Sequence, residues 1–536
     1  MAQGRHERRA GGEASFVTQE AAATRQFRSH VGHISRQSGI FFAGTIFTAA
    51  FSYVFKVYLA RVLGAEDLGI YALGITLVGF VSIFNSLGLA QSAVRFVAAY
   101  SASGKFVELH SLLWRGGGIL LLANVGFAGL LLLFGRFVAV HVYHSPELVR
   151  YLPWLALIMI LGVFSNFYGK VLAGYRDLTH RTIIVNFVGS PLMMATALAL
   201  ILAGMRLRGY LLGQVLAATV VCVLLFIAVR RLTPEPARIT AQRGTALRRE
   251  VWAFSAAMMG ISLMEFLMAQ VDRITLGYYA GARAVGIYSV AAGLVVYVSL
   301  VLNSVNQVFS PMISDLHTRG ESILLSRLFQ SLTKWVLGLT IPLAAVIILF
   351  SRTLMRIFGH DFEEGWPILI IGTIGQLVNC GVGSVGFLLL MSGNERRLIK
   401  IQIVMATIMV VLSLALVPLW GVLGAAIAAA ITNAGTNLWN LIEVRSALGF
   451  SPYNRSYLRL LLPTVAVIMV VVLLKKHAEV FRHDWLTVGT TTVAAYAVFT
   501  AIIFAFGLDA DDRLIANEIW SRMRGKPVGT VAGAAS

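Results

Sequence analysis

The chain has 536 residues, of which 57% are apolar and only 13% are charged, and its mean hydropathy is +0.78. A soluble domain carries roughly 25% charged residues, so this composition excludes an ordinary water-soluble globular protein and indicates a chain whose solvent is lipid. Cys222 and Cys380 both stand in apolar stretches, which argues against a disulfide framework and against a cysteine metal site.

The chain begins with a polar segment, residues 1–37, that contains six arginines and three glutamates. It has neither the short apolar core nor the small-residue cleavage site of a signal peptide. We therefore expect a disordered basic tail that stays in the cytoplasm.

Fourteen segments carry the roughly 20 mostly apolar residues that a bilayer-crossing helix needs. They cover residues 38–60, 68–94, 116–135, 151–169, 183–203, 209–229, 251–271, 285–310, 335–351, 366–391, 401–417, 421–442, 460–474 and 486–507. We expect a very tight turn at Pro418, after the eleventh, and a second cytoplasmic tail over residues 508–536. The sequence thus predicts an all-α polytopic membrane protein of about 14 transmembrane helices.

Lysine and arginine are distributed unevenly between the two sides of these spans. The N-terminal tail, the even-numbered connections and the C-terminal tail hold 31 of the 44, whereas the odd-numbered connections hold 12. Because cytoplasmic loops keep the positive excess, both termini are predicted to be cytoplasmic. The formal charge of +19 is explained by this topology, so no nucleic-acid partner is expected.

One short stretch is written twice. GAEDLGIY at residues 64–71 and GARAVGIY at residues 281–288 agree at five of eight positions, with a constant offset of 217. Six spans separate the copies, so the halves enter the membrane with the same polarity, as parallel repeats do. Gly174 and Gly393 are a further matched landmark. The glycines suit tight turns that require positive φ.

The repeat predicts a 6+6+2 layout. A six-helix lobe over residues 38–230 is joined by a cytoplasmic loop, residues 231–250, to a second six-helix lobe over residues 251–445. Two additional transmembrane helices follow in residues 446–507. Two equivalent bundles of this kind usually rock about a central site to give alternating access, so a transporter is the default inference.

Two cations occupy equivalent positions near the predicted outer end of the first helix of each half, since Lys56 and Arg273 are 217 residues apart. Charged residues at membrane depth are costly, about 2.5–3.5 kcal/mol on insertion scales. Lys56 either snorkels to the interface or shares a cavity with Arg273.

Glu265 and Asp272 are seven residues apart on the seventh span and therefore lie on nearly the same helix face. Asp272 either forms a structural pair with Arg273 or Lys56, or takes part in ion coupling. Glu265 has no local partner in the sequence, so its carboxyl group is either protonated or solvated by a cavity. It is the first candidate for ion coupling.

The eighth span carries three amides, Asn303, Asn306 and Gln307, at a spacing that places them on one stripe. Arg95 ends the second span on the cytoplasmic side. Such side chains fit the hydroxyl groups of a sugar chain, but amides also join helices at energies near 0.6 kcal/mol. Both interpretations stay open from the sequence.

No catalytic or cofactor motif stands out. There is no phosphate-binding Gly-Lys-Ser/Thr loop, no Gly-x-Ser-x-Gly elbow, no metal-ligand spacing and no large extramembrane domain. The sequence predicts neither an enzyme nor a cofactor or metal. Energy would come from an ion gradient, the membrane potential or the substrate gradient.

Three segments carry a resemblance to a known family: Leu59 to Tyr100, Val271 to Ala291 (VDRITLGYYAGARAVGIYSVA) and Val417 to Ala434 (VPLWGVLGAAIAAAITNA). They resemble bacterial polysaccharide flippases of the O-antigen type, members of the multidrug/oligosaccharidyl-lipid/polysaccharide (MOP) exporter superfamily. The resemblance implies two six-helix lobes in a V around a central cavity. It also implies translocation of a polyprenyl-diphosphate-linked oligosaccharide across the bacterial inner membrane.

On that resemblance, Lys56 and Arg273 would attract the diphosphate, and the amide stripe would contact the glycan. Membrane lipids, glycosyltransferases and a polysaccharide polymerase are the implied partners. The alternatives are a cation-coupled multidrug or small-molecule antiporter of the same superfamily, a lipid II-type flippase, and a membrane-embedded glycan polymerase or ligase. The last needs a larger outside loop than this sequence offers.

Overall fold

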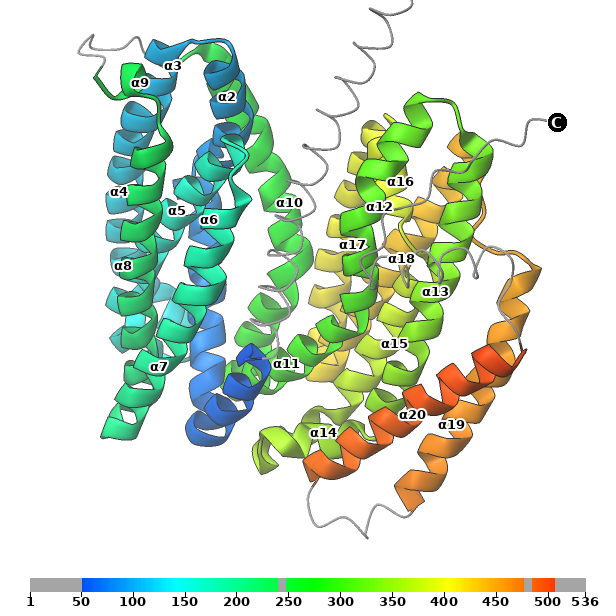
Figure 1. Cartoon of the computed structure of the whole chain (residues 1–536). Helices are drawn as coiled ribbons and strands as arrows, with labels where there is room; N and C mark the ends of the chain where they lie inside the picture. Colours follow the sequence, from blue (N-terminus) through cyan, green and yellow to red (C-terminus); the bar gives the residue numbers. More distant parts are fainter. Residues whose placement is uncertain (1–50, 240–246, 477–483, 507–536) are drawn as a thin grey trace, which may run out of the picture. The chain divides into compact units, whose positions relative to one another are not determined.

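The computed structural model describes residues 51–239, 247–476 and 484–506, and these residues form helices with no strand among them (Figure 1). In hydrocarbon every backbone polar group must be satisfied within the chain, which leaves the helix as the main element for a chain of this composition. The two expected tails and the first part of the first span lie outside the described residues.

The chain divides into two compact units that do not coincide with the sequence halves. Of the described residues, unit 1 holds 51–56, Val81–Leu132 and Leu152–Gly260. Unit 2 holds Val57–Phe80, Leu133–Tyr151 and the described residues from Ile261 onward. Two segments of the first half therefore pack in unit 2.

Unit 1 contains most of the first half. Its helices are α2 (Leu89–Ala102), α3 (Phe106–His110), α4 (Gly116–Phe137), α5 (Leu152–Gly174), α6 (Leu178–Thr182), α7 (Ser190–Leu200), α8 (Arg206–Leu232) and α9 (Glu235–Ile239), with the beginning of α10 (Arg249–Tyr279). Phe96, Phe167 and Leu225 bring α2, α5 and α8 together in one buried cluster. Because lipid is as apolar as these side chains, close packing supplies the stabilisation.

The described part of the loop between the halves is attached to unit 1 at two points. The Nδ1 atom of His110 lies 2.7 Å from the carbonyl oxygen of Ala237. Arg248 pairs with Glu108 at 2.7 Å. This loop is thus part of the packing of unit 1.

Unit 2 contains the rest of α10 and the second set of helices. They are α11 (Gly281–Val295), α12 (Leu300–Thr318), α13 (Ser322–Leu349), α14 (Ser351–Phe358), α15 (Trp366–Val382), α16 (Val385–Met391), α17 (Glu395–Trp420), α18 (Val422–Leu448), α19 (Leu461–Lys476) and α20 (Asp484–Phe506). Val346, Val467 and Phe499 attach the last two helices to α13. Tyr496 also donates a hydrogen bond of 2.8 Å to the carbonyl of Leu339.

Eleven helical stretches among the described residues are long and apolar enough to cross a membrane. Two of them, Phe51–Asn85 and Leu178–Leu232, are interrupted by Gly64 (φ 81°) and Gly204 (φ 85°), and each covers parts of two expected spans. α18 has 27 residues but is not among the eleven. The polytopic helical fold is confirmed, while the count of fourteen stays a prediction.

The repeat is present in the backbone φ angles as well as in the amino-acid sequence. Residues with positive φ recur at nearly the same offset in both halves: Gly64 and Gly281 (217), Gly104 and Gly320 (216), His144 and Gly359 (215), Arg176 and Gly393 (217), Gly204 and Gly421 (217). Left-handed backbone is uncommon outside glycine, so five coincidences indicate two copies of one helical plan.

Two expectations about turns are corrected. The equivalent of Gly393 is Arg176 (φ 62°), because Gly174 lies within α5, packed against Val97. The tight turn is at Gly421 (φ 53°), and α17 continues through Pro418. The reversal between α17 and α18 uses a positive φ at Gly421, and proline, whose φ is fixed at about −65°, cannot adopt it.

Gly213 tests the close packing of α7 against α8. A Cβ atom at this position would lie 2.6 Å from the backbone nitrogen of Ala197. We expect Gly213→Ala to lower the melting temperature of the purified protein in detergent, since the two backbones must separate. Gly129→Ala on α4, where nothing lies within 4 Å of the added carbon, should leave it unchanged or raise it. Equal behaviour of the two variants would contradict this.

Candidate functional site

Asp272 is the most enclosed carboxylate of α10. Its side chain is only 6% exposed. The hydroxyl of Tyr288 on α11 donates to Oδ2 at 2.5 Å, and the backbone N–H of Arg273 donates to Oδ1 at 2.7 Å. Each carboxyl oxygen therefore has a donor, as a buried charge or carboxyl group requires.

The side chain of Arg273 turns back along its own helix. Its Nη1 atom donates to Oε1 of Gln270 at 2.5 Å and to the carbonyl of Ala269 at 3.2 Å. The same Gln270 oxygen accepts from the hydroxyl of Thr76 at 3.3 Å. Unit 2 thus contains a polar network that joins α10, α11 and the Val57–Phe80 segment of the first half.

Sequence reasoning missed three members of this network, Tyr288, Gln270 and Thr76. Tyr288 had a usable signal, because it is the last residue of the repeated motif and corresponds to Tyr71 in the first copy. The position equivalent to Asp272, however, is Phe55. The tyrosine belongs to the shared plan, and its carboxylate partner belongs to the second half alone.

Glu265 differs from Asp272 although the two are seven residues apart on one helix. Glu265 is exposed, and no hydrogen bond or ion pair engages it among the residues that the structure describes. α10 is also the least buried of the eleven candidate spans, with 11% of its most apolar window buried, compared with 56% for α13. A carboxyl group in the middle of such a helix needs water or a polar ligand beside it.

The amide stripe of α12 divides into two parts. Asn306 is buried and accepts a hydrogen bond of 2.5 Å from the hydroxyl of Ser384, at the start of α16. Asn303 and Gln307 are exposed. Asn306 therefore joins helices in this structure. The side-chain amide of Asn303 donates a long hydrogen bond of 3.4 Å to the hydroxyl of Ser299, one turn earlier, and both exposed amides keep further donors and acceptors that a ligand can use.

Lys56 and Arg95 both lie in unit 1 and both are exposed. The Arg95 guanidinium carbon sits 4.8 Å from the ring centroid of Phe254 and 5.6 Å from that of Phe96. Such cation–π contacts are worth about 0.5–1 kcal/mol at exposed sites. They hold the Arg95 charge beside the first turns of α10.

Among residues 51–239, 247–476 and 484–506, no group of three His, Cys, Asp or Glu side chains could hold a metal ion. What unit 2 presents instead are two exposed amides and one exposed carboxyl group on helices of a membrane-spanning bundle.

Comparisons with known proteins give the chain its relatives. A family model described as "Polysaccharide biosynthesis protein" matches residues 34–317. The probable flippase AglR of Haloferax volcanii is 23% identical over 425 residues, which cover 77% of this chain and 83% of that protein. The succinoglycan biosynthesis transport protein ExoT of Rhizobium meliloti is 24% identical over 327 residues, 60% of this chain and 62% of that protein.

A solved structure shares the fold. The lipid II flippase MurJ, in an inward closed conformation, superimposes with a TM-score of 0.65 at 15% identity. The alignment covers 86% of this chain and 98% of that one. At this identity the likeness concerns the fold alone.

Removal of the Tyr288 hydroxyl tests the buried pair. We expect Tyr288→Phe to destabilise the protein by about 1–3 kcal/mol, because Asp272 would lose one of its two donors in a buried place. Tyr278→Phe, at a tyrosine that is 48% exposed, is the matched control. Thermal unfolding in detergent provides the measurement. A double variant with Asp272→Asn should show a smaller loss than the sum of the single changes, and strict additivity would argue against the pair.

Proposed function

This chain belongs to the family of polysaccharide biosynthesis proteins, and on that premise we propose that it is a flippase. Its cargo is a polyprenyl-diphosphate-linked oligosaccharide destined for a surface polysaccharide. The chain moves this cargo across the membrane by alternating access. AglR, ExoT and the shared fold with MurJ support the assignment.

The observation that carries the proposal is the exposure of polar side chains on α10 and α12. Glu265, Asn303 and Gln307 are exposed, although they lie on helical stretches that are apolar enough to cross a membrane. Groups of this kind at membrane depth face water or a cargo with hydroxyl groups. A glycan with many hydroxyls can exchange hydrogen bonds with such amides as it passes.

Within this proposal the cations act on the diphosphate. Lys56 and Arg273 occupy equivalent positions in the two halves, and a diphosphate attracts such charges. Arg273 is held in place by Gln270, which positions its guanidinium. Arg95 would meet the cargo on the cytoplasmic side.

The membrane is the bacterial inner membrane, with both termini in the cytoplasm, as the lysine and arginine distribution predicts. The repeated turns then lie at the outer side. Membrane lipids receive the polyprenyl tail, while glycosyltransferases supply the cargo and a polymerase consumes it.

A cation-coupled antiporter of small molecules is the second candidate. The exposed carboxyl group of Glu265 favours it, because a carboxylate at this depth suits a cationic substrate or a coupling ion. Family membership favours the glycan, so Glu265 is assigned to coupling within the flippase.

Loss of both cations tests the role of the diphosphate. We expect Lys56→Ala combined with Arg273→Ala to reduce surface polysaccharide by roughly 10-fold or more, the factor for about 1.4 kcal/mol of binding. Surface polysaccharide is measured in cells that carry the variant as their only copy. Arg136→Ala with Arg208→Ala, two exposed arginines, should export normally. Normal export by the first pair, at equal expression, would remove these cations from the mechanism.

Glu265→Gln tests coupling. Glutamine keeps the shape but cannot gain or lose a proton, so we expect the dependence of export rate on pH to flatten in this variant. Glu147→Gln, at an exposed glutamate of the Pro146–Tyr151 turn, should keep the pH profile of the unaltered protein. If Glu265→Gln also keeps that profile, the carboxyl group has no part in coupling.

A further inference from the structure

The two copies of the repeated turn touch each other within unit 2. A Cβ atom on Gly69 would lie 1.7 Å from the carbonyl oxygen of Ala282, and one on Gly286 would lie 1.9 Å from the carbonyl oxygen of Ala65. Ala65 corresponds to Ala282, and Gly69 to Gly286, at the offset of 217. The contact is therefore reciprocal, and it places two helix backbones at the closest approach that small residues permit.

A first arm reaches this contact from the second half. The arm is the segment of residues 351–365, which holds α14 and the turn after it. Arg61 of the first half donates from Nε to the carbonyl oxygen of Ile357 at 2.8 Å. The last four carbonyls of a helix lack partners within it, so the end of α14 is a natural acceptor for a cation. Asp361 of the same arm has a carboxylate oxygen 3.7 Å from the Cβ position of Gly64.

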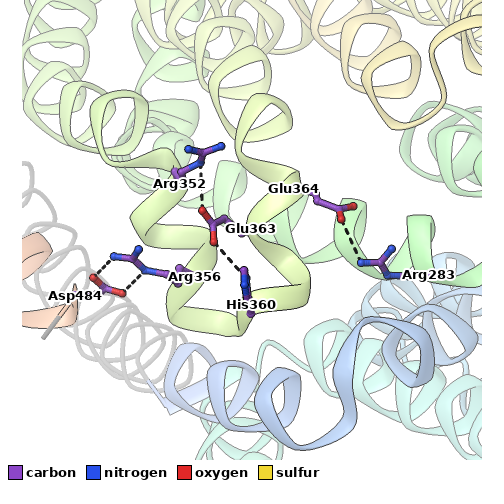
Figure 2. A network of polar contacts seen from close by, with 7 residues as sticks. All are labelled: Arg283, Arg352, Arg356, His360, Glu363, Glu364 and Asp484. Carbon is purple, nitrogen blue, oxygen red and sulfur yellow. Dashed lines mark hydrogen bonds and ion pairs between the residues drawn. The ribbon is translucent and has the colours of Figure 1, made fainter.

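The first arm is anchored to its own half by ion pairs (Figure 2). Arg356 makes two hydrogen bonds to Asp484, at the start of α20, of 2.7 and 2.6 Å. Glu364 pairs with Arg283, in the second copy of the turn, at 3.3 Å. Arg352 pairs with Glu363 at 3.2 Å inside the arm. The arm is thus fixed to α11 and α20 by ion pairs. Its contact with the first half is the hydrogen bond that Arg61 donates to Ile357.

A second arm reaches from the first half to the second half. It is the connection after α4 in the first half, residues 138–151, which belongs to unit 2. The ring of Tyr143 lies 2.9 Å from the Cβ position of Gly277, at the end of α10. The ring centroids of His144 and Tyr278 are 6.0 Å apart.

The arms are equivalent by the repeat. Tyr278 stands 217 residues after Arg61, and His144 shares its positive φ with Gly359, which stands 215 residues further on. The connection after the third span of each half therefore holds the first helix of the other half at the same position. The chemistry differs, since one arm uses a cation on a helix end and the other uses aromatic rings.

We propose that the two arms and the crossing between them form a reciprocal clasp that keeps the outer side of the protein closed. The inference rests on the proposed function, because it assigns the clasp to the step in which the cargo is released on the outer side. For the outer side to open, both arms must lose their contacts with the other half. Because Gly69 and Gly286 have no side chains, the two helix backbones can separate at the crossing without any side chain having to move aside.

Chemical labelling of the crossing tests the clasp. Ala65 and Ala282 are 2% and 8% exposed, so a cysteine at either place is protected while the clasp is closed. A membrane-impermeant maleimide is added to intact cells that carry Ala65→Cys or Ala282→Cys in the full chain. Cells with the unaltered chain, which contains Cys222 and Cys380, give the background.

Arg61→Gln weakens the first arm, and His144→Ala weakens the second. Each should raise the labelling rate, by roughly 10-fold for a loss near 1.4 kcal/mol, and the double variant should raise it further. Arg352→Gln is the matched control, because this arginine of the first arm contacts only the second half among the described residues, through its ion pair with Glu363 and its contact with the ring of Trp366. It should leave the labelling rate unchanged.

The possible outcomes separate the clasp from the flippase. Unchanged labelling in both arm variants, together with normal surface polysaccharide, overturns the clasp and leaves the function standing. Labelling that rises equally in Arg352→Gln also overturns it, since general loosening would then be the cause. Labelling that responds as expected in a chain whose removal leaves surface polysaccharide intact supports the clasp and rejects the proposed function.

Discussion

A polar group inside a membrane must have a hydrogen-bond partner or contact water. This constraint explains where most of the polar side chains discussed above lie. Asp272 satisfies it by pairing, with Tyr288 and a backbone N–H as donors. Asn306 satisfies it through Ser384. Glu265, Asn303 and Gln307 are left uncovered, so water or cargo must serve them. The division between buried and exposed polar groups therefore separates the scaffold from the proposed transport surface.

The same constraint decides how the helices meet. Hydrocarbon gives apolar side chains no reason to prefer each other over lipid, so contacts depend on close backbone approach and on a few hydrogen bonds. Gly69 and Gly286 supply the first at the repeated turn. Arg61 at the end of α14 supplies the second. Contacts of this kind hold a transporter together and can also be broken and remade.

Much of the fold could be predicted from the sequence because turns between membrane helices are demanding. Gly64 and Gly281 need positive φ, and the need preserved glycine in both copies. His144 and Gly359 both have positive φ but are different residue types, so a comparison of the two halves of the sequence does not reveal this pair. The arms of the clasp were missed for that reason. The site was predicted less well, because the sequence does not show whether a polar side chain already has a hydrogen-bond partner. Asn306 is bonded to Ser384, and Arg273 is bonded to Gln270.

The two halves share one arrangement of helices but differ in chemistry at one position. This position directly precedes the equivalent cations Lys56 and Arg273. The first half has Phe55, whose ring lies 6.2 Å from that of Tyr210. The second has Asp272, bonded to the tyrosine that ends the repeated motif. A carboxylate in both halves would need a second set of buried hydrogen-bond donors. The asymmetry therefore places the buried carboxyl group and its tyrosine partner in the second half alone, where the same helix also carries the exposed Glu265.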